Sequence, residues 1–137
     1  MKKLTVLMLV LVAVAVLVSA CGGGGSAAPG SGDAARGKTL YNKTTLGKKS
    51  AEGCVACHKY SEKDGKAEKA PYTAGTATRS ASRVPGMKAD AYIRESLLKP
   101  DAYIVEGWNK GDMYAKWQDD LSAQEIEDLI AYLLTEK

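Results

Sequence analysis

The chain has 137 residues, a formal net charge of +3, three cysteines and one histidine. This length allows one small domain, and the presence of a single long apolar run excludes a polytopic membrane protein. The first 20 residues hold 16 of the 62 hydrophobic residues and two lysines, so the other 117 residues carry a net charge of only +1. A nucleic-acid binder driven by positive charge is therefore not expected. The chain contains no Phe, so we expect a core with few bulky apolar side chains.

Residues 1–20 are typical of an export signal. Two lysines precede an apolar run, and small residues lead to Cys21 in the sequence VSAC. This arrangement resembles the lipobox of bacterial lipoproteins, in which the signal is cut before a cysteine that carries a lipid. The alternative is an uncleaved anchor, because the apolar run is nearly long enough to span a bilayer. Both alternatives predict that the rest of the chain lies outside the cytoplasm, on the periplasmic or outer side of a cell membrane.

Residues 21–32 comprise this cysteine and a Gly/Ser-rich segment without an apolar pattern, which predicts a flexible tether. The folded domain is then expected over residues 33–137. A lipid with two or more acyl chains would attach it stably to the membrane. We therefore expect its partners at the same membrane surface.

Three helices are predicted in the domain. Asp33 is a suitable N-cap for a helix over residues 34–43. A second helix starts near Asp90, with Ile93 and Leu97 on one face, and ends before a proline at position 100. A third begins at Ser122, where a glutamate three positions on completes a capping box and apolar residues follow in helical period.

The intervening segments 59–88 and 100–121 are rich in Lys, Gly, Asp, Thr and Ser and are predicted to be loops. An all-α domain of this size with such long loops needs an additional source of stability. A large, flat apolar ligand would supply it, since every loop could pack on that ligand.

The motif with the clearest chemistry is Cys54-Val55-Ala56-Cys57-His58, a C-x-x-C-H sequence typical of c-type haem attachment. Two thiols three positions apart on a short helical turn can reach the two vinyl groups at one porphyrin edge. The histidine that follows then faces the iron. Export agrees with this interpretation, because covalent haem attachment takes place outside the cytoplasm.

Three other interpretations of this motif are less favoured. A disulfide between Cys54 and Cys57 would leave His58 without a role. A thioredoxin-like pair needs a βαβ context, and no strand pattern precedes the motif. A structural zinc site needs four ligands, and with Cys21 used for lipid attachment only three remain.

His58 is the only histidine, so the chain cannot supply bis-histidine ligation or bind a series of haems. The sixth iron ligand is then a methionine, an unusual Lys, Tyr or amine, or absent. After signal cleavage, Met87 and Met113 are the remaining methionines. Although methionine is more often core filler than ligand, the polar loop around Met113 favours it.

From about Lys38 to the C-terminus the chain resembles a class I cytochrome c. The resemblance rests on an N-terminal helix, the C-x-x-C-H motif, long loops, a methionine loop and a C-terminal helix. It implies an all-α fold of about three to five helices wrapped around one covalently bound haem c. Gly37 and Tyr41 match the family's Gly/aromatic pair, which packs against the last helix, where Tyr132 and Leu129 are the corresponding candidates.

Residues 82–107 are similar to small membrane-associated cytochromes and to the haem domains fused to subunit II of some haem-copper oxidases. In those relatives the next methionine is the distal iron ligand, which implies this role for Met113. The family usually has proline after that methionine, whereas this chain has Tyr114.

The resemblance also implies a haem environment. Pro71, preceded here by alanine where the family has glycine, supplies a carbonyl that accepts the Nδ1–H of the proximal histidine, His58. Arg83, Tyr103 and Trp108 are of the types that bind haem propionates in the family. Ordinary packing of these three amphipathic side chains remains an equal alternative.

Charge is divided between the two halves of the domain. Residues 33–88 hold 12 Lys/Arg and 5 Asp/Glu, a balance of +7, and residues 89–137 hold 5 and 11, a balance of −6. Such a dipole would steer the domain toward a partner with an acidic docking surface.

Together these features predict a membrane-anchored mono-haem cytochrome c that carries single electrons between a membrane-bound donor and acceptor complex. It is not expected to be an enzyme, because no residues are arranged for acid–base or nucleophilic chemistry. The alternatives are a fixed cytochrome subunit of a respiratory or photosynthetic complex and a haem sensor or enzyme with an open distal site.

Overall fold

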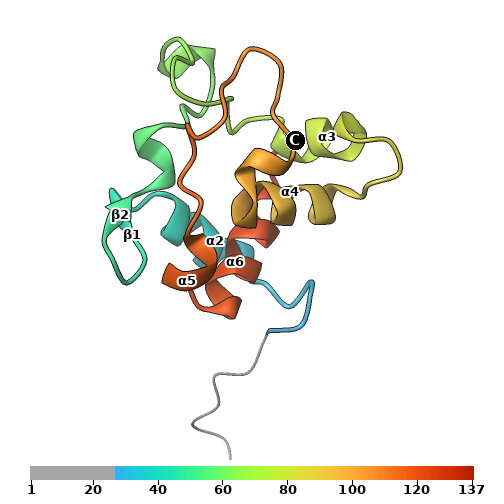
Figure 1. Cartoon of the computed structure of the whole chain (residues 1–137). Coiled ribbons are helices and arrows are strands. Elements are labelled where there is room, and N and C mark those ends of the chain that lie inside the picture. Colours follow the sequence, from blue (N-terminus) through green and yellow to red (C-terminus); the bar gives the residue numbers. More distant parts are fainter. Residues whose placement is uncertain (1–26) are drawn as a thin grey trace, which may run out of the picture.

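The computed structural model describes residues 27–137, which are mostly helical (Figure 1). Within them the elements are α2 Ala34–Tyr41, β1 Thr45–Leu46, β2 Ala51–Glu52, η1 Cys54–Ala56, η2 Glu62–Asp64, α3 Thr76–Arg83, α4 Ala89–Leu98, η3 Pro100–Ala102, α5 Trp117–Asp120 and α6 Ala123–Leu133. The two short strands pair antiparallel, with Leu46 opposite Ala51. The five α-helices of this part of the chain confirm the predicted all-α class.

The predicted signal segment 1–20, the predicted lipidation site Cys21 and residues 22–26 of the predicted tether lie outside the described residues. Within residues 27–137, no helix combines the length and the apolar character needed to cross a membrane.

The three predicted helices are present as α2, α4 and α6. Asp33 caps α2 by accepting a hydrogen bond from the backbone N–H of Arg36 at 2.9 Å. α4 ends two residues before Pro100 and buries Ile93 and Leu97. The capping box at the start of α6 is present, with Ser122 as its N-cap. The local signals of capping and periodicity therefore located these helices correctly.

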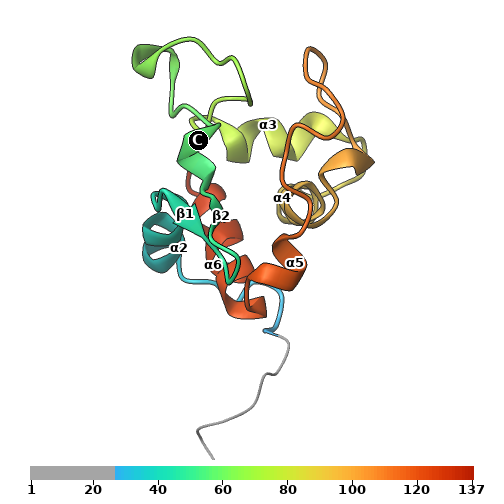
Figure 2. The same cartoon turned by 60° about the vertical axis from the view of Figure 1, so that its left-hand side comes forward.

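α2 and α6 pack with their backbones in contact, and the two helices lie side by side in both views (Figures 1 and 2). Gly37 makes this approach possible, because a Cβ at this position would overlap the carbonyl oxygen of Asp128 on α6. One turn later, the ring of Tyr41 lies on the ring of Tyr132, with centroids 5.2 Å apart. The predicted packing of the Gly37/Tyr41 pair on the last helix is thus confirmed.

Two helices lie in segments predicted to be loops. α3 falls within residues 59–88 and α5 within residues 100–121. α3 buries only Ser80, and its N-cap, Gly75, has a left-handed backbone and no side-chain cap, so neither a stripe of large apolar residues nor a capping side chain marks it in the sequence. It is held instead by packing on α4 and by a hydrogen bond from Ala77 N to the Glu136 carbonyl at 2.8 Å. α5 has four residues, too few for a periodic pattern.

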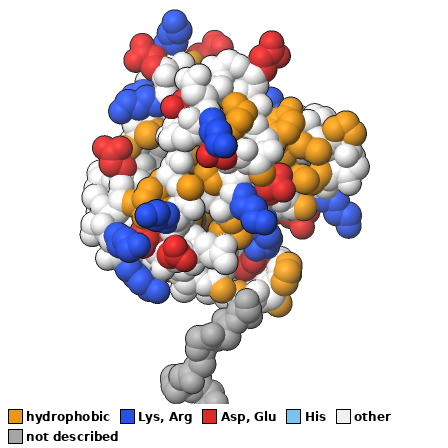
Figure 3. Space-filling model, viewed as in Figure 1, with side chains coloured by type: hydrophobic (Ala, Val, Ile, Leu, Met, Phe, Trp, Pro, Cys, Tyr) orange, Lys and Arg blue, Asp and Glu red, His pale blue; other side chains and the backbone are white. Residues whose placement is uncertain are grey.

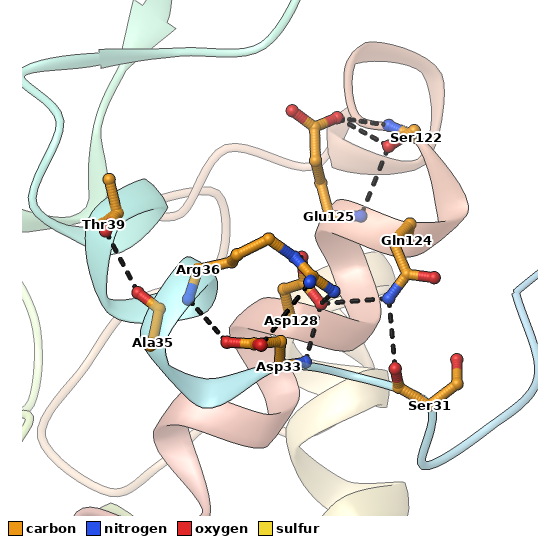
Figure 4. Close-up of polar contacts among 9 residues, drawn as sticks. All are labelled: Ser31, Asp33, Ala35, Arg36, Thr39, Ser122, Gln124, Glu125 and Asp128. Carbon is orange, nitrogen blue, oxygen red and sulfur yellow. Dashed lines mark hydrogen bonds and ion pairs between the residues drawn. The ribbon is translucent and has the colours of Figure 1, made fainter.

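Residues 30–33, which we call the N-terminal strap, are hydrogen-bonded to α6. Gly30 N donates to the Glu127 carboxylate at 3.0 Å, and Asp33 N donates to the Asp128 carboxylate at 2.8 Å. Figure 4 shows Ser31 and Asp33 lying against the first turns of α6, where the Gln124 amide donates to the Ser31 carbonyl at 3.2 Å. The end of the segment predicted as a flexible tether is therefore bound to the domain.

Two arginines complete the contacts of these carboxylates. Arg36 bonds both oxygens of Asp128, with Nε 2.8 Å from Oδ2 and Nη2 2.9 Å from Oδ1 (Figure 4). This bidentate pairing lowers the pKa of Asp128 to about 2. Arg94 on α4 pairs with Glu127 at 2.6 Å and lowers the pKa of that carboxylate. The pairs join α2, α4 and the N-terminal strap to α6.

Replacing Gly37 with alanine tests the α2–α6 contact. Helix propensity alone would favour alanine by about 1 kcal/mol, but the added Cβ meets the Asp128 backbone, so we expect a loss of at least about 2 kcal/mol in the free energy of unfolding. Urea unfolding of the holoprotein measures this. The control, Ala35→Gly on the exposed face of α2, should lose only about 1 kcal/mol. Unchanged or increased stability of Gly37→Ala would contradict the described packing.

The lowered pKa of Asp128 predicts a pH dependence of stability. Because the folded-state pKa of about 2 lies below the ordinary 3.8, the stabilisation is complete above pH ~4 and is lost as the pH falls toward 2. We expect the wild type to lose about 1–2 kcal/mol more than Asp128→Asn between pH 5 and pH 2. Urea unfolding at a series of pH values checks this, with Asp119→Asn, an exposed carboxylate on α5, as the control. If the free energy of unfolding changed equally with pH in the wild type and in Asp128→Asn, the predicted role of Asp128 would be refuted.

Candidate haem-binding site

A cavity of about 610 Å³ lies inside the ring formed by the helices and the loops between them. This volume is within the range of sites that enclose a cofactor-sized ligand. Its lining includes every residue that the sequence assigns to haem attachment, iron ligation or the haem environment, namely Cys54, Cys57, His58, Pro71, Arg83, Tyr103, Trp108 and Met113. The fold thus collects residues that are up to 59 positions apart around one space.

The two cysteines lie on the 3-10 helix η1 and at its C-cap, directly after the β1–β2 hairpin. Gly53 precedes the cysteines, and a Cβ at this position would overlap the carbonyl oxygen of Lys43. The backbone N–H of Gly53 donates to the carbonyl oxygen of Thr44 at 2.8 Å. Cys54 and Cys57 form no disulfide with each other. Burial raises the pKa of Cys54 to about 11, so the thiol is neutral at pH 7. The hairpin therefore presents two unpaired thiols to the cavity from a backbone held in place on both sides.

His58 follows on the same turn, with its backbone N–H donating to the Cys54 carbonyl at 2.9 Å. Its Nδ1 lies 2.8 Å from the carbonyl oxygen of Pro71. A carbonyl only accepts, so Nδ1 carries the proton and Nε2 keeps a free lone pair. Burial lowers the pKa of His58, which favours the neutral imidazole that a metal requires. The hydrogen bond expected between Pro71 and His58 is therefore present.

The two candidate methionines differ in position. Met113 is half-buried and lines the cavity, together with Tyr114, Trp108 and Trp117. Met87 is also half-buried and packs against the hydrophobic core, but it is not among the cavity-lining residues. Of the two, Met113 is the one placed to reach a group bound in the cavity.

Two arginines of α3 also line the cavity. Arg83 has a buried Nε that finds no hydrogen-bond partner within the described part of the chain. Arg79, four residues earlier, donates to the carbonyls of Ala74 at 2.7 Å and Tyr72 at 2.5 Å. Arg79 was not predicted from the sequence, because its spacing with Arg83 places both on one face only if residues 76–83 form a helix, which was not predicted either.

These observations fit a bound haem. The lining includes apolar side chains from α4, α5 and α6, among them Ile93, Leu97, Trp117 and Leu129, which suit the faces of a porphyrin. The unpaired donor of Arg83 suits an anionic group, and haem carries two propionates. Within residues 27–137, no three His, Cys, Asp or Glu side chains form a group able to hold a metal ion, so the zinc alternative lacks its ligands there.

Comparison with known proteins supports this assignment. The family model of cytochrome c matches residues 34–137, which is most of the chain. No curated protein and no solved structure matches the chain. Members of this family bind haem c covalently, with one haem in a small domain. The chain therefore belongs to the cytochrome c family and is a haem-binding electron-transfer protein with covalently attached haem c.

Proposed function

We propose that this protein is a lipid-anchored mono-haem cytochrome c that passes single electrons between membrane redox complexes outside the cytoplasm. The observation that carries the proposal is the arrangement of the cavity lining. Cys54, Cys57 and the oriented His58 enter it from the hairpin side, and the loop before α5 brings Met113 to the same cavity. One attachment motif and one histidine set the number of haems at one.

The side chains have separate roles. Haem c, when bound, supplies an iron that exchanges one electron. Cys54 and Cys57 would hold the group through thioether bonds, and His58 would offer Nε2 to the iron while the Pro71 carbonyl keeps its ring in one orientation. Met113 would offer its thioether to the same iron, and this type of ligand raises the reduction potential. With both ligands supplied by the chain, little would have to rearrange when an electron moves.

The cavity wall also affects the redox state that the site prefers. The buried side chains of Ile93, Leu97 and Leu129 exclude water from the lining. A low dielectric disfavours extra charge, so the apolar wall favours the reduced iron, which carries one positive charge fewer. Arg83 offers its unpaired Nε to an anionic group at the same site. With His58 and Met113 both assigned to the iron, no ligand position is left for a substrate, and for this reason we infer a carrier and not a catalyst.

The membrane attachment rests on the N-terminal sequence. The apolar segment after two lysines, followed by VSAC, supports cleavage before Cys21 and lipidation of its thiol. The N-terminal strap shortens the tether that the sequence predicts, because residues 30–33 are bonded to α6 and only residues 22–29 then separate them from Cys21. A tether of this length has a reach of roughly 16 Å. The domain then works close to the membrane surface.

Charge supports an acidic partner surface. The +7 balance of residues 33–88 includes Lys48 and Lys49 in the turn of the β1–β2 hairpin, both exposed. Figure 3 shows Lys and Arg side chains gathered over this hairpin side of the molecule and exposed hydrophobic side chains over α3 and α4. Because the hairpin leads directly into the cysteine motif, a partner attracted to it would approach the attached edge of the haem. Such association weakens as salt is added.

Carbon monoxide binding by the reduced holoprotein tests the ligand set. We expect the wild type not to bind CO and Met113→Ala to bind it promptly, because the substitution removes the sixth ligand. Met87→Ala is the matched control and should behave as the wild type. Absorption spectra with and without CO measure the difference. Prompt, complete CO binding by the wild type would favour a sensor or enzyme with an open distal site. CO binding by Met87→Ala but not by Met113→Ala would show that Met87 is the ligand.

Replacing Cys21 with serine tests the anchor. The variant should keep its haem, because Cys54 and Cys57 are unchanged, but its N-terminal peptide should carry no lipid, whereas that of the wild type should begin at Cys21 with lipid attached. Haem staining, together with mass spectrometry of the N-terminal peptides of both proteins, measures this. A wild-type peptide without lipid, or one that keeps residues 1–20, would support the uncleaved anchor instead.

A further inference from the structure

Asp120, the last residue of α5, is a buried carboxylate that the proposed electron-transfer role does not use. Its side chain is only 1% exposed. Oδ2 accepts a hydrogen bond from the Tyr114 hydroxyl at 2.6 Å, whereas Oδ1 has no hydrogen-bond partner among the described residues. The nearest cation is Lys49, whose Nζ lies 3.7 Å from Oδ1 on a side chain that is 62% exposed. Burying a carboxylate with so few compensating contacts costs stability. This cost points to a role for Asp120 in the protein.

The position of Asp120 is fixed by the hairpin that leads to the cysteine motif. The backbone N–H of Lys48 donates to the Asp120 carbonyl at 3.1 Å. Gly47 lies directly over the residue, with a left-handed backbone (φ 79°) and only 2.9 Å between the position of a Cβ and the Cβ of Asp120. Asp120 is therefore anchored to the hairpin before it contacts Tyr114.

Tyr114 is the residue after Met113, and two contacts hold its side chain. Besides the bond to Asp120, its ring lies edge-on to Trp117 with centroids 4.7 Å apart, and Trp117 is buried. On the other side of Met113, Gly111 N donates to Asp101 at 2.9 Å through a hydrogen bond that is exposed to water, whereas the Tyr114–Asp120 bond is partly buried. A hydrogen bond in a low dielectric is the stronger one, so the main restraint on Met113 comes through Tyr114.

We propose that the Tyr114–Asp120 hydrogen bond is a latch that holds Met113 in the cavity, with Asp120 and Tyr114 as positioning residues for the distal ligand. This inference rests on the proposed role of Met113. The latch connects the loop of the distal ligand to the hairpin of the cysteine motif through one buried carboxylate. The strength of this hydrogen bond would set how readily another ligand replaces Met113 at the iron.

Imidazole added to the oxidised, full-length holoprotein in detergent tests the latch, because it binds ferric haem only when Met113 leaves. Tyr114→Phe keeps the ring against Trp117 and removes only the hydroxyl. We expect it to bind imidazole about 10-fold more tightly than the wild type, the equivalent of one hydrogen bond to a charged group. Asp120→Asn keeps an acceptor without the charge and should give a smaller increase. Spectrophotometric titration measures all the affinities.

Three further variants separate the possible outcomes. Tyr60→Phe removes a hydroxyl from an exposed tyrosine outside the cavity lining and should match the wild type. If both latch residues act through one bond, Tyr114→Phe/Asp120→Asn should show no more than the Tyr114→Phe effect. Met113→Ala should bind imidazole more tightly than every other variant.

The possible failures are distinguishable. If Met113→Ala does not tighten imidazole binding, the distal ligand is wrong and the latch fails with it. If Met113→Ala tightens binding while Tyr114→Phe and Asp120→Asn match the wild type, the ligand assignment stands and the latch is refuted. Reduced resistance to urea in Tyr114→Phe with unchanged imidazole affinity would also refute it, because the bond would then only stabilise the fold.

Discussion

The architecture depends on the direct backbone contact between α2 and α6. Gly37 lets the helices meet at the Asp128 carbonyl, and the Tyr41–Tyr132 ring contact continues the interface by one turn. These helices belong to the two ends of the domain, so their contact closes the intervening chain into a ring. The cysteine motif and the methionine loop both lie on that ring (Figure 2), and residues of both line the cavity. The Arg36–Asp128 pair and the N-terminal strap strengthen the same junction.

The cavity of about 610 Å³ has a largely apolar lining and is partly open to solvent. Leaving apolar surface in water forfeits roughly 25 cal/mol per Å² of burial, so the fold gains stability when a ligand covers this lining. The chain has no Phe to fill such a space, whereas a porphyrin suits the apolar lining and its propionates suit Arg83. Haem is thus both the redox centre and a large part of the core, which explains how a chain with long loops folds at this size.

The sequence predicted the parts of this structure that depend on local signals. Capping at Asp33 and Ser122 located α2 and α6, and the C-x-x-C-H spacing marked the attachment site before any tertiary contact was known. α3 was not predictable, because it has no side-chain N-cap and its position depends on packing against α4. The same holds for Arg79 and for the Tyr114–Asp120 bond, which join residues whose proximity only the folded loops create. Met113 could be preferred over Met87 by its loop, but its place in the cavity lining came from the fold.

The central claim is that one chain supplies both axial ligands, His58 from the cysteine motif and Met113 from the loop before α5. X-ray absorption at the iron edge of the holoprotein tests this most directly, because sulfur and nitrogen neighbours scatter differently. The account predicts five nitrogen neighbours and one sulfur in both the oxidised and the reduced protein. A first shell without sulfur in either state would contradict it.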